Sequence, residues 1–329
     1  MAGCRMVSAH FTREGDRLMQ VPSAALAGLA GISFAFIGIG YRLGSRHNIH
    51  ELHVMAMMAA VGAAVFCPRA IPLIRQAPPS VWWIALIAGM TQYVTVYEIR
   101  AALKRGPLTA AWCAVMLGFI PVIIYARLMF GETVTAWHYA AAVAGSACVV
   151  AAATLTSPGQ ASATAGRHVG RVIVFGALLL GILIVNSLTN LATKHLAMVQ
   201  VDAGQSQMDL FGDLFLAVLY VAALLSVIID QAVTRRPIPN PRRAAAAGAL
   251  AGAGAVGGMW LLCSCASAAA GSVFVMSTVS SILFTALVGA LWFGEQRTWR
   301  WYATLGLGVL AAVLSQGEAI VRAILTSGP

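Results

Sequence analysis

Long apolar runs alternate along the chain with short polar stretches. A helix needs about 20 apolar residues to cross the hydrocarbon core of a bilayer. By this measure the pattern predicts ten membrane-spanning helices, with the residue ranges 22–42, 50–67, 81–103, 107–129, 134–155, 171–192, 209–230, 243–264, 270–293 and 299–321. The apolar runs are continuous and do not alternate with polar positions, which excludes a spanning β-barrel. We therefore expect an all-α, polytopic membrane protein.

Composition supports this expectation. Hydrophobic residues make up 60% of the 329 positions and charged residues only 10%, with a mean hydropathy of +0.82. Because a soluble domain carries about 25% charged residues, this chain has too few charges to cover a surface that faces water. The predicted helices fill almost the whole chain between an N-terminal tail, 1–21, and a C-terminal tail, 322–329. No soluble catalytic domain fits in what remains.

The net charge of +10 does not indicate a nucleic-acid partner. The arginines lie at the ends of the apolar runs, where they would contact lipid headgroups of the bilayer. Residues 1–21 keep their charges as far as Arg17 and precede a run long enough to span. We therefore expect a tail there and not a cleaved signal peptide.

Two segments of the chain, 106–150 and 269–313, match each other without a gap. Aligning Phe-Gly-Glu at 130–132 with Phe-Gly-Glu at 293–295 also aligns a tyrosine, an alanine and a glycine downstream. A second match joins the end of the first predicted helix to the end of the sixth. Helices one to five therefore correspond to helices six to ten.

Because five is odd, the second copy would enter the membrane upside down. This predicts an inverted repeat, an organisation that is common among transporters. The copies would be residues 22–155 and 171–321, joined by a Ser-, Ala-, Gly- and Thr-rich linker at 156–170.

This organisation, with Phe-Gly-Glu at the same place in each copy, resembles the EamA family of the drug/metabolite transporter (DMT) superfamily. Residues 106–132 resemble the fourth helix of that family and residues 270–295 the ninth. The resemblance covers about residues 24–155 and 171–316, with two departures. Phe284 takes the place of Pro121 in the second copy, and the third helix ends in charged residues.

The resemblance implies a carrier in the cytoplasmic membrane, with both termini in the cytoplasm. The basic residues favour the opposite orientation, because more of them fall on the loops that this topology places outside. Both orientations therefore remain open. A homodimer is also compatible with the sequence.

Four polar residues recur on the sixth predicted helix, at positions that share one face: Asn186, Thr189, Asn190 and Lys194. A polar stripe on an apolar helix points into the bundle or into a wet cavity. The stripe would bind substrate there, or alternatively form hydrogen bonds between helices. We expect Lys194 at the membrane interface, where it would attract an anionic substrate.

Helix three carries Gln92, Tyr93 and, nearer its end, Glu98 and Arg100. Gln92 and Tyr93 are candidates for the wall of a substrate cavity, and Glu98 is a candidate proton site. The alternative for the two charges is an interfacial belt, with Glu98 paired to an arginine.

Other carboxylates lie near helix ends. Asp209 is expected to cap the seventh helix, and Asp213, one turn deeper, is a candidate for a coupling ion or proton. Glu132 and Glu295 each follow a glycine, and we expect each to cap the next helix.

Trp112 and Trp260 could stack on a planar substrate, although packing is the commoner role of a tryptophan. Four glycines on the eighth predicted helix allow close helix packing: Gly248, Gly252, Gly254 and Gly258. Five of the six cysteines lie in or at the ends of apolar helices and are read as small apolar residues.

The sequence predicts no catalytic residues, metal site or cofactor. It lacks the zinc-protease, Walker and nucleophile-elbow motifs, and nothing in it would hydrolyse ATP. The favoured function is a secondary transporter of a small molecule, such as a metabolite, an amino-acid-like compound or a drug. It would use alternating access, driven by protons, exchange or the substrate's own gradient. The alternatives are a membrane-embedded enzyme that modifies lipid and a membrane partner subunit that transports nothing.

Overall fold

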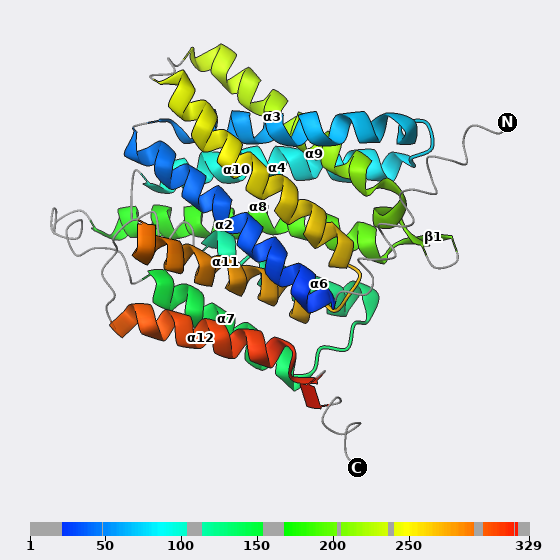
Figure 1. The fold of residues 1–329 in the computed structure, drawn as a ribbon, viewed down its shortest axis with the longest axis vertical. Helices are drawn as coiled ribbons and strands as arrows, with labels where there is room; N and C mark the ends of the chain where they lie inside the picture. The colour runs from blue at the N-terminus through cyan, green and yellow to red at the C-terminus, as the bar shows by residue number, and fades with distance from the viewer. Residues whose placement is uncertain are drawn as a thin grey trace.

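The computed structural model describes residues 22–47, 49–103, 114–153, 168–202, 205–235, 240–292, 299–318 and 320–321. Figure 1 shows these ranges as a bundle of helices that run roughly parallel or antiparallel to one another. The all-α fold class predicted from the sequence is confirmed. The described ranges contain ten α-helices: α2 (Ser23–Arg46), α3 (Glu51–Ala70), α4 (Pro79–Leu103), α6 (Phe119–Phe130), α7 (Ala136–Ala153), α8 (His168–Met198), α9 (Gln207–Thr234), α10 (Pro241–Cys265), α11 (Ala270–Trp292) and α12 (Trp299–Ser315).

Six of these helices contain segments long and apolar enough to cross a membrane. The segments are Ser23–Gly44, Glu51–Leu73, Ile173–Met198, Gln207–Thr234, Pro241–Cys265 and Ala270–Trp292. Three shorter apolar helices accompany them, at Ala114–Phe130, Ala136–Ala151 and Trp301–Ser315. These segments indicate an integral membrane protein. The helix α4 has the length of a span, but polar residues in its middle, among them Gln92, reduce its hydropathy.

The helix predicted at 107–129 is interrupted, and this is a difference from the expectation. Residues 114–116 are helical, Leu117 and Gly118 form a turn, and α6 then begins at Phe119. The cause is Pro121, which has no N–H to donate to the carbonyl of Leu117, four residues earlier. Ile120 donates to that carbonyl instead, at 3.0 Å, in the tighter geometry of a 3₁₀ turn.

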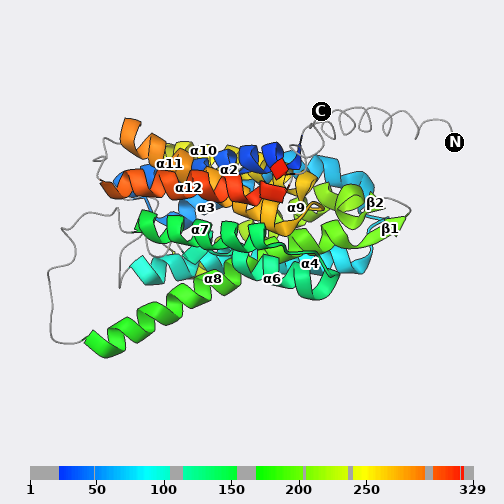
Figure 2. The same ribbon diagram turned by 90° about the horizontal axis from the view of Figure 1, so that it is seen from below.

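The helices form two main layers in the view of Figure 2. One layer contains α2, α10, α11 and α12, and the other contains α4, α6 and α8. The helix α2 packs on both α10 and α11, whereas α8 packs on both α4 and α6. The predicted linker at 156–170 falls mostly outside the described residues, and α8 begins at His168.

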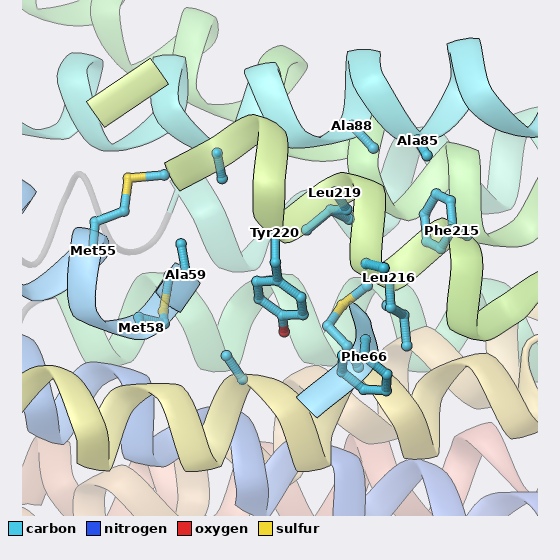
Figure 3. Close-up of a cluster of buried hydrophobic side chains, with 14 of the residues drawn as sticks. Met55, Met58, Ala59, Phe66, Ala85, Ala88, Phe215, Leu216, Leu219 and Tyr220 are labelled. Atoms are coloured by element: carbon cyan, nitrogen blue, oxygen red, sulfur yellow. The ribbon is translucent and has the colours of Figure 1, made fainter. Parts of the chain in front are cut away.

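The largest buried apolar cluster lies among α3, α4, α9 and α10. Figure 3 shows Tyr220 of α9 at its centre, with side chains of α3 and α4 around it. The Tyr220 ring stacks on Phe66, with ring centroids 6.0 Å apart. The same ring lies directly against the backbone of Gly62, so that a Cβ atom at this position would overlap it. Gly62 is therefore required by the close approach of α3 and α9.

The glycines of α10 are packing residues, as the sequence predicted. Gly248 and Gly252 face α3, whereas Gly254 and Gly258 face α2. A Cβ atom at any of the four would overlap atoms of the facing helix. Glycine on two sides of α10 lets it fit between α2 and α3 at close range.

A short hairpin that the sequence did not predict joins α8 to α9. It consists of β1 (Gln200–Asp202) and β2 (Gln205–Ser206), which pair antiparallel. Ser206 then caps α9, and its hydroxyl accepts from the N–H of Asp209 at 3.2 Å. The carboxylate of Asp209 accepts from the N–H of Ser206 at 2.8 Å, which completes a capping box and confirms the predicted capping role of Asp209.

Candidate functional site

A cavity of about 150 Å³ lies inside the bundle, between the two layers. Side chains of α2, α10 and α11 line one side, and side chains of α4, α6 and α8 line the other, together with Met58 of α3. Because the lining comes from early and late segments of the chain, the cavity forms only when the whole bundle assembles. Four residues selected from the sequence line it: Gln92, Asn186, Thr189 and Asn190.

The residues of the polar stripe on α8 correspond to both alternatives that the sequence left open, because some line the cavity and some form hydrogen bonds to neighbouring segments. Thr189 shares a hydrogen bond of 3.1 Å with the hydroxyl of Thr91 on α4, and it donates to the carbonyl of Ala88 at 3.3 Å. Thr189 therefore joins α8 to α4 as well as lining the cavity. Asn190 lines the cavity, and its amide makes no hydrogen bond to any residue that the structure describes.

Asn186 forms a hydrogen bond to the backbone at the helix break before α6. Its amide donates to the carbonyl of Val115 at 2.9 Å. The same carbonyl accepts from the N–H of Gly118 at 3.1 Å in the tighter geometry of the turn, so Asn186 adds a second hydrogen bond where the regular helix is interrupted. Gly118 makes the contact possible, since a Cβ atom there would lie 2.9 Å from the Asn186 amide nitrogen. The sequence signals for this arrangement were Pro121 and Asn186, but nothing in the sequence connected them.

A row of hydroxyls on α11 faces the cavity and was missed by the sequence reasoning. Ser277, Thr278 and Ser281 all line it, across from the amides of α4 and α8. The signal was present, because serines and threonines cluster in the middle of an otherwise apolar helix. Short hydroxyls are common in membrane helices as packing residues, so their presence alone did not single them out.

Lys194 is fully buried, at 0% exposure, so it is not open to water as the expected attraction of an anionic substrate would require. Its ammonium group forms an ion pair with Glu132 and donates to the carbonyls of Ala266 at 3.1 Å and Ala268 at 2.8 Å. These partners satisfy the three donors of a lysine. A substrate anion could reach Lys194 only by displacing one of them.

Glu132 does cap a helix, but a different one from the helix expected. Its second carboxylate oxygen accepts from the N–H of Ala270 at 3.0 Å, at the start of α11, and α7 is the next helix in sequence. Gly131 directs the carboxylate there, because it ends α6 in the left-handed conformation, with φ of 63°. We refer to Glu132, Lys194 and the backbone groups of Ala266, Ala268 and Ala270 as the Glu132–Lys194 cluster.

The Glu132–Lys194 cluster lies one helical turn beyond the cavity on three separate helices. On α8, Lys194 follows the cavity residue Asn190 by four positions. On α10 and at the start of α11, the residues of the cluster are likewise four positions from cavity residues, Leu262 and Phe274 respectively. Four residues span about 6 Å along a helix. The cluster therefore lies across one end of the cavity.

Other predicted residues lie away from the cavity. Tyr93 packs against the core of α3 and α9, and Trp260 is 37% exposed on the outside of the bundle. Glu98 lies between α4 and α8 against Gly181, and its buried Oε2 has no hydrogen-bond partner among the described residues. Asp213 is half-buried near the end of α3, where it interacts electrostatically with Arg69.

Two further predicted residues, Trp112 and Glu295, lie outside the described residues. The four cysteines that the structure describes, at positions 67, 148, 263 and 265, are free. Within the same described ranges, His, Cys, Asp and Glu side chains do not gather in a group that could hold a metal ion.

Comparisons with known proteins identify solved structures of similar fold, but they indicate no function. No protein-family model matches the chain, and no curated protein matches it. Twenty-seven chains of solved structures do match. One of them, described only as the crystal structure of a protein, is similar with a TM-score of 0.67 and 16% identity, over 91% of this chain and 98% of its own. At this identity the similarity concerns the fold alone, and it extends over nearly the whole chain.

Proposed function

We propose that this protein is a secondary transporter that moves a small molecule across a membrane by alternating access. The observation that carries the proposal is the cavity inside the bundle, lined by the amides of Gln92 and Asn190 and by hydroxyls of α11. Polar groups are costly at the depth of a membrane, and those that face a cavity mark a pathway for a polar solute. A cavity between two sets of helices is also where a carrier binds its substrate.

The arrangement of contacts supports a ten-span inverted repeat, in which α2 to α7 correspond to α8 to α12. The helix α2 packs on α10 and α11, and its counterpart α8 packs on α4 and α6, the counterparts of those two. Likewise α3 packs on α10, and its counterpart α9 packs on α4. This exchange of partners is what two related halves would produce. Two such halves can exchange conformations, so that a cavity open to one side becomes open to the other.

The resemblance to the EamA family belongs to the same proposal. The Phe-Gly-Glu sequence that carries it provides Gly131 and Glu132, which together connect the end of α6 to the start of α11. A cytoplasmic-membrane location and a driving force from protons, exchange or the substrate gradient go with this proposal. No chemical step is needed.

Flux into proteoliposomes tests the proposed function. The purified protein would first be screened by thermal shift against small polar solutes, and the solutes that stabilise it would then be offered as radiolabelled substrates. We expect uptake above that of protein-free vesicles, and a large loss of it in Asn190→Leu, which removes a cavity amide and keeps the number and branching of the side-chain heavy atoms. Trp260→Leu is the matched control, because Trp260 lies outside the cavity and its replacement should leave uptake unchanged. An absence of flux across the whole panel, with and without a pH gradient, would reject the proposal.

A further inference from the structure

The chemical character of the cavity limits what it can bind. None of the side chains that line it among the described residues carries a formal charge. Its polar groups are amides and hydroxyls, and the rest of the wall is aliphatic or aromatic, with Phe34, Phe119 and Phe274 among the aromatic residues. An ion moved from water into such a site loses much of its hydration and finds no counter-charge in the wall. This transfer costs far more free energy than moving a neutral polar group that finds hydrogen bonds there.

The amides offer hydrogen bonds that nothing in the described structure uses. Gln92 and Asn190 both face the cavity, and neither side chain bonds to a described residue. Each amide provides two N–H donors and one carbonyl acceptor. Together they match a ligand group that both donates and accepts, such as an amide or a hydroxyl.

The size of the cavity limits the apolar part of the ligand. An apolar cavity of about 150 Å³ in another protein holds one benzene molecule. The cavity here has a similar volume and adds polar groups along its wall. From these observations we propose that it binds an uncharged solute made of one ring or a similar apolar body and one amide or hydroxyl group. This substrate class rests on the transporter function proposed above.

Three probes that share one skeleton test the proposed class: phenylacetamide, phenylacetate and 2-phenylethylamine. They place a neutral amide, an anion and a cation at the end of the same ring and short chain. Binding to the purified full chain in detergent would be measured by isothermal titration. We expect phenylacetamide to have a Kd at least about tenfold lower than that of either ion, since each well-made hydrogen bond contributes about that factor. Asn190→Leu should raise that Kd by a similar factor, and Trp260→Leu should not change it.

The outcomes separate the substrate class from the transporter function. If phenylacetate or 2-phenylethylamine binds as tightly as the amide, or if none of the three binds, the proposed class is wrong. Flux of a charged solute in the proteoliposome assay would in that case support the transporter function while the proposed substrate class is rejected. An absence of both binding and flux would reject the two proposals together.

A second inference comes from an independent observation, the position of the Glu132–Lys194 cluster. The cluster joins the end of α6 to α8 and to the connection between α10 and α11, and it lies one turn beyond the cavity on three helices. We infer that it closes one end of the cavity and separates when that end opens. A buried ion pair suits this role because its desolvation cost nearly cancels its Coulomb attraction. The closed form and a hydrated open form then differ by little free energy, as a switch requires.

A reporter cysteine in the cavity tests this inference without a substrate. Thr278→Cys, in a chain whose native cysteines are replaced by alanine or serine, would be labelled in vesicles by a membrane-impermeant maleimide added from each face. We expect Glu132→Gln to raise the labelling rate from one face by roughly tenfold, because it weakens the closed state, and not to raise it from the other.

The control variant changes a residue near the same end of α11 but breaks contacts outside the cluster. Ser272, two residues from the cluster, bonds to His138 at 3.2 Å and donates to the carbonyl of Ser315 at 2.9 Å. Ser272→Ala removes both bonds and should leave labelling unchanged. Lys194→Met provides a second way to break the pair if Glu132→Gln does not fold. Unchanged labelling in whichever of the two variants elutes as a monodisperse protein would overturn the inference.

Discussion

Replacing Glu132 with glutamine removes one charge from an ion pair whose other member, Lys194, has no exposed surface. The ammonium group keeps its bonds to the carbonyls of Ala266 and Ala268 but loses its counter-charge. Breaking a buried pair by removing one partner costs about 3–5 kcal/mol, because the remaining charge is left uncompensated. We therefore expect Glu132→Gln to lower the free energy of unfolding by about that amount, and Lys194→Met to have an effect of similar size.

The double variant distinguishes an ion pair from two independent contacts. With both charges removed no buried ion is left unpaired, so Glu132→Gln with Lys194→Met should cost no more than either change alone. The coupling free energy of this double-mutant cycle should therefore be at least about 3 kcal/mol, the cost of one single change. Titration with sodium dodecyl sulfate in mixed micelles, followed by tryptophan fluorescence, provides the four unfolding free energies.

A more exposed pair serves as the control for this cycle. The imidazole of His50 lies 3.9 Å from the carboxylate of Glu51, and both side chains contact solvent. Such pairs contribute about 0–1 kcal/mol, so Glu51→Gln should change the free energy of unfolding by less than about 1 kcal/mol. If the two changes in the Glu132–Lys194 pair add to within about 0.5 kcal/mol, the pair is not coupled and the reasoning is refuted.

Three further variants test contacts elsewhere in the fold by the same unfolding titration. Asn186→Leu should cost about 0.5–1.5 kcal/mol, because it removes one of the two hydrogen bonds to the carbonyl of Val115 and leaves only that from the N–H of Gly118, whereas Ser187→Ala, whose described hydroxyl bond is within its own helix, should cost less. Gly62→Ala should cost about 1–3 kcal/mol, since the new Cβ atom overlaps the ring of Tyr220, and unchanged stability would contradict the packing of α3 on α9. Ser206→Ala removes the capping box of α9 and should cost about 1 kcal/mol; a change below a few tenths would contradict the capping role.

The apolar pattern predicted the helices well because burial in lipid requires length and hydrophobicity, and both can be read directly from the sequence. All ten predicted ranges contain helix, but α6 begins only at Phe119, within the range predicted at 107–129, and α8 continues to Met198, six residues past its predicted end. The pattern did not predict the turn at Leu117 and Gly118, although Pro121 was its cause. Proline frees the carbonyl of Leu117, which Ile120 satisfies within the turn, whereas the carbonyl of Val115 takes a hydrogen bond from Asn186, 71 residues away in sequence.

The candidate site was partly predictable for the same reason. The stripe on α8 could be recognised because helical periodicity places its members on one face, and three of them do line the cavity. The burial of the fourth, Lys194, was not predicted, because nothing in the sequence shows that Glu132, which follows α6, pairs with it. Periodicity places a residue on a face of its own helix, but it does not identify the partner that faces it.

Access to the cavity from the two faces of the membrane tests the transporter account most directly. A single cysteine at Thr278, in a chain whose native cysteines are replaced, would be exposed to an impermeant maleimide from one face of the vesicle and then, in a separate sample, from the other. The account predicts labelling from both faces, and slower labelling from both when a cavity ligand such as phenylacetamide is present. Labelling from one face only, or from neither, would contradict alternating access through this cavity.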